Sequence, residues 1–167
     1  SLAAYGKSSE EAEEFLNVLT ATQNNTSTTM SELLQVYRTQ ANTFRLLNVD
    51  FNESATLLGL VANRSLKGSD AATALNAVML RLLGTNKKSA EALEDIGVSA
   101  WDAEGNFRGL TTTLNDINEK MAGMTRQEEI MFKKNVAGVM RFEELEVLLE
   151  AAKDPKYQEL FDTVSHA

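Results

Sequence analysis

The sequence contains no cysteine, one histidine and one proline in 167 residues. Without cysteine there is no disulfide, thiol nucleophile or thiolate metal site, so packing alone has to hold the fold, and a reducing compartment is suggested. The one histidine, His166, stands next to the last residue, which nearly excludes His-dependent acid-base chemistry and a His-rich metal site. The sequence therefore lacks the side chains on which the chemistry of most familiar enzyme classes depends.

Long apolar runs and an excess of positive charge are also missing. No stretch approaches ~18 consecutive apolar residues, and no basic start followed by an apolar run marks a signal peptide, so no membrane contact is expected. Lys and Arg number 16 against 24 Asp and Glu, which gives a formal net charge of -8. Such a charge opposes unaided binding to nucleic acid or anionic lipid, and we expect no direct nucleic-acid binding.

Helix-forming residues dominate what is present. Ala, Leu, Glu, Lys, Met and Gln fill the stretches between polar breaks, and proline hardly interrupts them. No internal repeat and no long linker divides the chain. We therefore expect an all-α fold: a single compact helical domain over 1–167 with about eight or nine short helices. Because the chain begins with Ser1 rather than Met, we expect it to be a segment of a longer product.

Capping and breaking residues delimit the expected helices. Thr28 or Thr29 can cap one helix, and Asp50 with Glu53 forms a capping box, as does the pair Thr125 and Glu128. Further boundaries are set by Ser69 and Thr85 as caps, by Gly84, Gly97 and Gly123 as stops, and by Pro155 at the first position of the last helix. The expected helices cover about 9–23, 30–47, 51–62, 70–82, 87–95, 110–121, 126–136, 139–152 and the segment from 154 onward.

The pattern changes between the fifth and sixth of these helices. Val98–Trp101 and Asn106–Arg108 are short segments with aromatic residues, and the polar turn Asp102–Gly105 separates them. This arrangement predicts one small β-hairpin near 98–108. Trp101, the only tryptophan, is expected to anchor that hairpin against the helices, with an exposed partner contact as the alternative.

Two segments resemble ligand-binding loops only in part. Asp102–Asn106 invites comparison with a calcium loop, but the sixth and twelfth positions, which need Gly and Glu, are Phe107 and Thr113. Gly84–Ser89 ends like a phosphate-binding loop, yet the required glycines are replaced by Leu82 and Lys87. We therefore expect a plain turn in the first segment and solvated residues at a helix start in the second.

The acidic clusters 10–14 and 143–150 could in principle supply paired carboxylates, but they alternate with apolar residues as solvated helix faces do. The methionines fall on the same stripes as Leu and Ile, so they are expected to fill the core, with an adaptable partner groove as the alternative. The sequence thus predicts no catalytic, cofactor-binding or metal-binding residue, and it leaves the partner-binding residues unassigned.

Several segments, taken in order, resemble one known family. They are Thr28–Leu33, Leu58–Asn63, Leu66–Leu75, Met79–Leu82, Ala90–Gly97 and Trp101–Arg108. Over about 28–150 the chain is similar to the core region of phage tail tape measure proteins. Asn135–Arg141 departs from the family's pattern, which leaves the C-terminal boundary of the resemblance open.

The resemblance implies a non-enzymatic virion component that is assembled in the bacterial host cytoplasm and ends in the lumen of the tail tube. Such a protein sets tail length by templating tail tube polymerisation and is released during genome ejection. The implied partners are the tail tube protein, tail assembly chaperones and baseplate or tail-tip proteins, with a homo-oligomer in the tail as a further possibility. The residues themselves leave two alternatives: a generic helical adaptor that binds a partner helix through a Leu/Met groove, and a helical wall-degrading enzyme.

Overall fold

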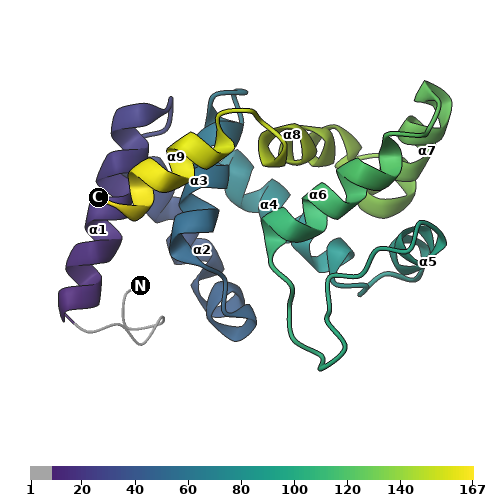
Figure 1. Ribbon diagram of the computed structural model, residues 1–167, viewed down its shortest axis with the longest axis horizontal. Coiled ribbons are helices and arrows are strands. Elements are labelled where there is room, and N and C mark those ends of the chain that lie inside the picture. Colours follow the sequence, from purple (N-terminus) through teal and green to yellow (C-terminus); the bar gives the residue numbers. More distant parts are fainter. Residues whose placement is uncertain (1–8) are drawn as a thin grey trace. The chain divides into compact units, whose positions relative to one another are not determined.

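The computed structural model describes residues 9–167, and this part of the chain forms nine α-helices and no β-strand (Figure 1). The helices are α1 (Ser9–Asn25), α2 (Met30–Leu47), α3 (Phe51–Ala62), α4 (Gly68–Leu82), α5 (Lys87–Asp95), α6 (Leu110–Met121), α7 (Arg126–Ala137), α8 (Phe142–Ala152) and α9 (Tyr157–Ser165). The prediction of an all-α fold is confirmed.

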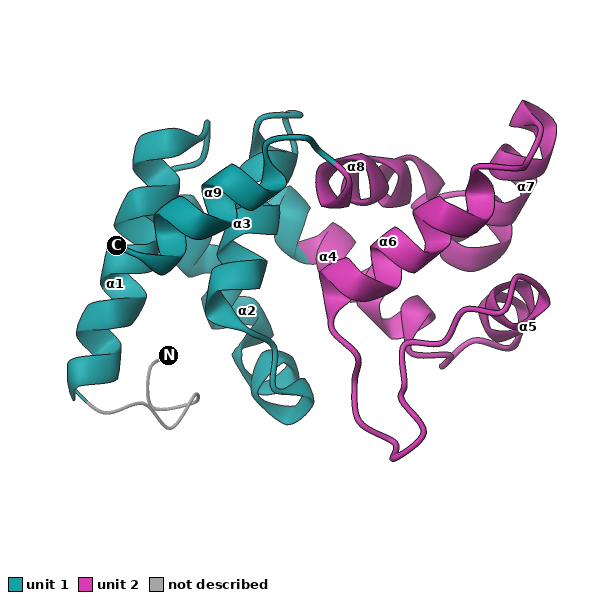
Figure 2. Cartoon of the chain, in the orientation of Figure 1, with its two compact units in different colours: residues 1–72, 154–167 teal, residues 73–153 magenta. Residues whose placement is uncertain are grey.

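The described residues fall into two compact units (Figure 2). Of the described residues, unit 1 contains 9–72 together with Asp154–Ala167, and unit 2 contains Thr73–Lys153. The chain passes between the units twice, at Ala72–Thr73 inside α4 and at Lys153–Asp154 in the short turn between α8 and α9. The expectation of one domain over 1–167 stays a prediction.

Local capping signals set the starts of four helices, α2, α3, α5 and α7. Thr29 and Glu32 form a reciprocal capping box at the start of α2, and Thr125 and Glu128 form another at the start of α7. Hydrogen bonds from the backbone and the side chain of Thr125 lower the pKa of Glu128. Asp50 caps α3 by accepting a hydrogen bond from the backbone N–H of Glu53 at 2.8 Å. The starts of α2, α3 and α7 follow from sequence neighbours alone, and their prediction is confirmed.

Four predicted boundaries were wrong, and the largest difference is at α8, which begins at Phe142 rather than near Val139. The cap of α5 is Asn86 rather than Thr85, whose hydroxyl donates instead to the carbonyl of Leu80 at 2.6 Å. Helix α4 begins at Gly68, one residue before the predicted cap Ser69. Pro155 lies in a turn ahead of α9, which begins at Tyr157. At α5 the neighbouring Asn86 meets the need predicted for Thr85, because its side chain accepts a hydrogen bond from the N–H of Ser89, and sequence alone does not choose between the two residues.

Unit 1 is built around α3, which contacts α1 and α9 and is buried from Ser54 to Ala62. An aromatic cluster lies at its start, where Tyr37 packs edge-on against Phe15, Phe44 and Phe51 with ring centroids 5.3–5.8 Å apart. The Tyr37 hydroxyl lies 2.6 Å from the hydroxyl oxygen of Ser54, so the buried phenol is hydrogen-bonded. Burial on all sides explains why α3 is apolar around its circumference.

Unit 2 packs α8 against both α6 and α7, and α7 also contacts α5. Leu114, Ile117, Val136 and Leu145 form its fully buried centre. Asn115 and Asn118 on α6 donate to the carbonyls of Ala152 and Leu149 at 3.0 and 2.9 Å. These amides supply donors to carbonyls in the last turn of α8 and thereby tie α6 to the end of that helix.

The predicted β-hairpin near 98–108 is not formed. A single antiparallel bridge joins Trp101 and Phe107, and the flanking hydrogen bonds run from Asp102 N to Asn106 O and from Arg108 N to Ala100 O. The ladder cannot lengthen, because Val98 N–H is already bonded to Leu93 O at the end of α5 and Gly109 is the N-cap of α6. The prediction recognised the turn but overestimated the strands beside it.

Candidate functional site

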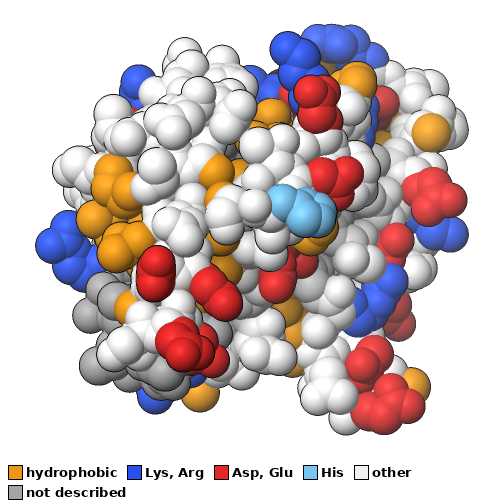
Figure 3. Space-filling view, turned by 60° about the vertical axis from the view of Figure 1, so that its left-hand side comes forward, with side chains coloured by type: hydrophobic (Ala, Val, Ile, Leu, Met, Phe, Trp, Pro, Cys, Tyr) orange, Lys and Arg blue, Asp and Glu red, His pale blue; other side chains and the backbone are white. Residues whose placement is uncertain are grey.

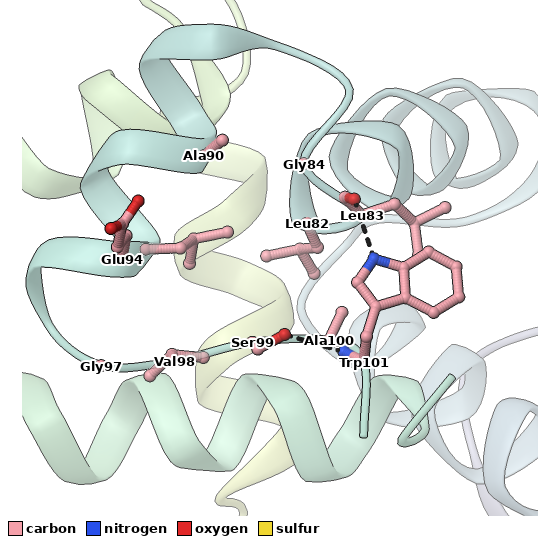
Figure 4. Close-up of a pocket in the computed structure, with 11 residues that line it drawn as sticks. Leu82, Leu83, Gly84, Ala90, Glu94, Gly97, Val98, Ser99, Ala100 and Trp101 are labelled. Atoms are coloured by element: carbon pink, nitrogen blue, oxygen red, sulfur yellow. Dashed lines mark hydrogen bonds between the residues drawn. The ribbon is translucent and has the colours of Figure 1, made fainter. Parts of the chain in front are cut away.

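An apolar groove in unit 2 is the candidate functional site (Figure 4). Its volume is about 370 Å³, and it lies between the end of α4, helix α5 and the segment that leads from α5 to Trp101. The lining residues are Leu82, Leu83, Gly84, Ala90, Leu93, Glu94, Gly97, Val98, Ser99, Ala100 and Trp101. Most of these side chains are aliphatic or aromatic, so the groove suits an apolar guest.

Two glycines give the groove its outline. Gly84 has φ +83° and ends the turn after α4, and Gly97 has φ +73° and ends α5. Both angles are in the left-handed region, which glycine adopts without strain. Beyond Gly97 the N–H of Val98 bonds to Leu93 O at 2.9 Å, which turns the chain back along the helix toward Trp101.

Trp101 is fixed at the rim of the groove. Its indole N–H donates to the carbonyl of Leu83 at 3.1 Å, and its backbone N–H donates to the Ser99 hydroxyl at 3.1 Å (Figure 4). Phe107 packs edge-on against the ring with centroids 6.3 Å apart. The side chain nevertheless remains 38% exposed. It therefore anchors the loop, as predicted, and also presents an aromatic surface to solvent.

The segment behind Trp101 is braced by charge. The Arg108 guanidinium donates to the carbonyl of Ser99 at 2.7 Å and forms an ion pair with Asp116 on α6 at 2.6 Å. Arg108 is only about a third exposed in its side chain, so this contact ties the loop to the body of unit 2. The rim of the groove is therefore held in place before any partner arrives.

The charges of α5 at the groove run against the helix dipole. Lys87 and Lys88 stand in its first turn, where the partial charge is positive, whereas Glu94 and Asp95 stand at its last residues, where the partial charge is negative. Glu94 lines the groove. The acidic side chains thus stand at the end of α5 where the helix dipole is also negative, and Glu94 places this charge at one end of the groove.

A second exposed apolar patch lies in the turn between α7 and α8. Val139 and Met140 are 72% and 83% exposed, and Met131 on α7 is 53% exposed. The prediction that methionines fill the core was wrong for Met131 and Met140, whereas Met79 and Met121 are buried as expected. Helical periodicity could not place Val139 and Met140, because Gly138, at φ +81°, breaks the helix just before them.

The two loops that the sequence analysis weighed as ligand sites are engaged in local structure. Asp102 Oδ1 accepts hydrogen bonds from the backbone N–H groups of Glu104 and Asn106, both at 2.9 Å, as in a plain polar turn. The hydroxyl of Ser89 lies within hydrogen-bond distance of the carbonyls of Arg81 and Asn86, at 3.1 and 3.0 Å, so it is engaged at the start of α5. Within residues 9–167 no three His, Cys, Asp or Glu side chains gather as metal ligands.

The acidic clusters are spread over helix surfaces. Glu144 pairs with Arg141 at 2.7 Å and Glu146 with Lys133 at 3.0 Å, so these two carboxylates have separate partners. On the face drawn in Figure 3, acidic side chains are scattered among polar and apolar ones. His166 is exposed at the end of α9. In the part of the chain that the structure describes, no helix has the length and apolar character that a membrane span requires.

The described residues thus form a helical chain with an apolar groove that Trp101 borders. The sequence model of the family described as phage-related minor tail protein matches residues 1–138, and the chain belongs to this family. It is therefore a component of a phage tail, and the family is a structural one.

Two relatives are described as tape measure proteins. The chain is 26% identical to the tape measure protein of Pneumococcus phage Dp-1, over 77% of this chain and 11% of that protein. It is 27% identical to the probable tape measure protein of Escherichia phage P2, over 94% of this chain and 20% of that protein. The resemblance noted from the sequence is confirmed, and the chain spans only a small part of these relatives' length. No solved structure matches the chain.

Proposed function

We propose that this chain is the core module of a tape measure protein, which sets tail length by templating tail tube polymerisation and leaves the tail during genome ejection. The similarity to the tape measure protein of phage Dp-1 and the probable one of phage P2, over most of this chain, carries the proposal. Both units belong to that module, because one boundary between them falls inside α4 and the other in the short turn between α8 and α9. The proposal gives the module no catalytic role.

Helix geometry limits how the module can take part in length measurement. A helix rises ~1.5 Å per residue, so 167 residues in one straight helix would span about 250 Å. The longest helix here, α2, has 18 residues, and turns connect it to its neighbours. A chain folded in this way adds far less length per residue than an extended helix. We therefore assign the measuring to other segments of the protein and the packing contacts to this module.

The proposed setting is the lumen of the tail tube after assembly in the host cytoplasm. There the module contacts the tail tube protein and the baseplate or tail-tip proteins, after tail assembly chaperones have released it. Each copy of the chain has a net charge of -8, so several copies side by side in the tube would repel one another. Such an arrangement therefore needs positive charge from other tail proteins.

The test is a series of in-frame deletions in the parent gene. Deleting long helical segments outside this module should shorten the tails by about 1.5 Å per residue removed. The matched comparison is an insertion of an extended helical segment of equal length, which should lengthen them equally. Tail lengths are measured in electron micrographs. Tails of unchanged length would overturn the proposal that the protein sets tail length.

A helical adaptor without any part in length measurement is the second candidate, and the apolar groove beside Trp101 favours it. If the chain is an adaptor, the deletions should leave tail length unchanged, whereas substitutions in the groove should impair tail assembly. The two functions are therefore separated by the same set of phages.

A further inference from the structure

We propose that the groove beside Trp101 binds an apolar segment of another polypeptide that also carries lysine or arginine. The inference concerns a binding surface of unit 2 and does not depend on the measuring role. It combines three observations: the apolar lining, a fixed and half-exposed tryptophan, and an acidic end whose charges destabilise the helix that bears them.

The apolar surface extends beyond the groove along α4. Leu80 is 42% exposed and precedes the groove-lining Leu83 by three residues, so both side chains lie on one face of the helix end. The indole of Trp101 lies beside Leu83, to whose carbonyl it is bonded. Leu80, Leu83 and Trp101 therefore form a strip that borders the hollow. An apolar residue of a partner would fill the hollow while its neighbours cover this strip.

The acidic end of the groove specifies the partner's charge. Among residues 9–167 no lysine or arginine lies within ion-pair distance of Glu94 or Asp95, and the last carbonyls of α5 add partial negative charge at the same place. Opposite charges at these positions would stabilise the helix, so the present ones are unfavourable for folding. Sequences depart from such local rules mainly at functional sites. A lysine or arginine on the partner would relieve this unfavourable charge.

The fixed geometry of Trp101 also favours binding. Its ring already has one orientation, so little side-chain freedom is lost when a partner covers it. The exposed ring face can additionally attract a cation, since Trp is the strongest of the aromatic side chains in this interaction. The net charge of -8 makes a second copy of the same chain an unfavourable occupant and a basic segment a favourable one.

The experiment uses the 167-residue chain and a displayed library of random 15-residue peptides without tryptophan. Peptides are selected on the unaltered chain and counter-selected on the double variant Glu94→Lys/Asp95→Lys. Both substitutions put favourable charges at the end of α5, so this variant is expected to fold. We expect the recovered peptides to combine apolar residues with lysine or arginine.

Binding is then measured for individual peptides by the fluorescence of Trp101, the only tryptophan. The emission should shift to shorter wavelength as the ring is covered, and affinity should fall about tenfold or more for Glu94→Lys/Asp95→Lys. The matched control is Glu119→Lys, an exposed acid on α6 outside the groove, which should leave affinity within about twofold. Rising salt should weaken binding to the unaltered chain.

Four results would overturn the proposal: no recovered peptide, recovered peptides that are acidic or uncharged, equal affinity for the double variant, or unchanged Trp101 emission on binding. An emission shift that follows protein concentration without peptide would assign the groove to a second copy and would overturn it as well.

Discussion

A Cβ atom added to Gly59 would lie 2.7 Å from the Cγ2 atom of Thr26 and 3.0 Å from that of Thr22. The hydroxyls of both threonines donate to carbonyls one turn earlier in the chain, Thr26 to Thr22 and Thr22 to Val18, each at 2.8 Å. Their methyl groups are therefore directed at α3, and α1 and α3 approach closely at this point. The glycine is present because the helices are in contact there, not because a turn requires it.

Gly59→Ala should destabilise the chain by about 1–2 kcal/mol. The overpacking is worth about 1–3 kcal/mol and is partly offset by the better helix propensity of alanine. Denaturant midpoints measure the effect. Adding Thr26→Ser, which removes the Cγ2 atom, should recover much of the loss. Gly123→Ala is the control, because no atom lies within 4 Å of its added Cβ; equal losses in the two glycine variants would contradict the close approach.

Lys133 and Glu146 should respond unequally to substitution. The ammonium of Lys133 lies 3.0 Å from Glu146 Oε1, and the lysine side chain is only 8% exposed whereas the glutamate is 49% exposed. Glu146→Gln leaves a buried charge without its counter-charge and should cost about 1–2 kcal/mol after allowance for solvent. Lys133→Met keeps the packing without the charge and should be near neutral. Thermal unfolding of both variants checks this, and the reverse order would refute it.

Acid should weaken unit 1 through Asp154. Partial burial acts to raise its pKa, but hydrogen bonds from the backbone of Lys156 and from Arg64, whose guanidinium lies 2.8 Å away, outweigh burial and lower the pKa below its ordinary value of 3.8. Since the folded pKa is the lower one, the carboxylate stabilises the fold fully above about pH 3.8, and this contribution is lost as pH falls through the folded pKa.

The variant that tests this is Arg64→Met. It should lower the free energy of unfolding by about 1 kcal/mol at pH 6 and by less at pH 2.5, as urea unfolding at both values can show. Arg38→Met, at an exposed arginine in the middle of α2, is the control and should have little effect at either pH. A loss for Arg64→Met that does not depend on pH would speak against the ion pair.

Correcting the charge at the start of α5 should stabilise unit 2. Lys88→Glu places an acid in the first turn and should raise the free energy of unfolding by about 0.5 kcal/mol at low salt. The same exchange at Lys120, in the last turn of α6, should lower it by a similar amount. Denaturant midpoints at two salt concentrations measure both. A destabilising effect of Lys88→Glu would mean that Lys88 stabilises the fold, and it would contradict the view that the charges of α5 are unfavourable for folding.

The candidate groove shows where sequence reasoning reaches its limit. The turn at Asp102–Gly105 and the anchoring role of Trp101 were predicted, because both depend on residues close together in the chain. The hollow itself was not, since Leu82 and Val98 come together only when α5 turns back. Reversed charges at the ends of α5 were visible in the sequence and could have indicated the site.

The sequence by itself determined the all-α class, most helix starts and the family, because capping boxes, glycine stops and apolar periodicity act within a few residues. Tertiary structure decided what depends on distant partners. It reduced the predicted hairpin to the Trp101–Phe107 bridge, left Met140 in solvent while burying Met79, and required glycine at position 59. Each of these results depends on which helix surfaces meet, and that is settled by packing across the fold rather than by neighbours along the chain.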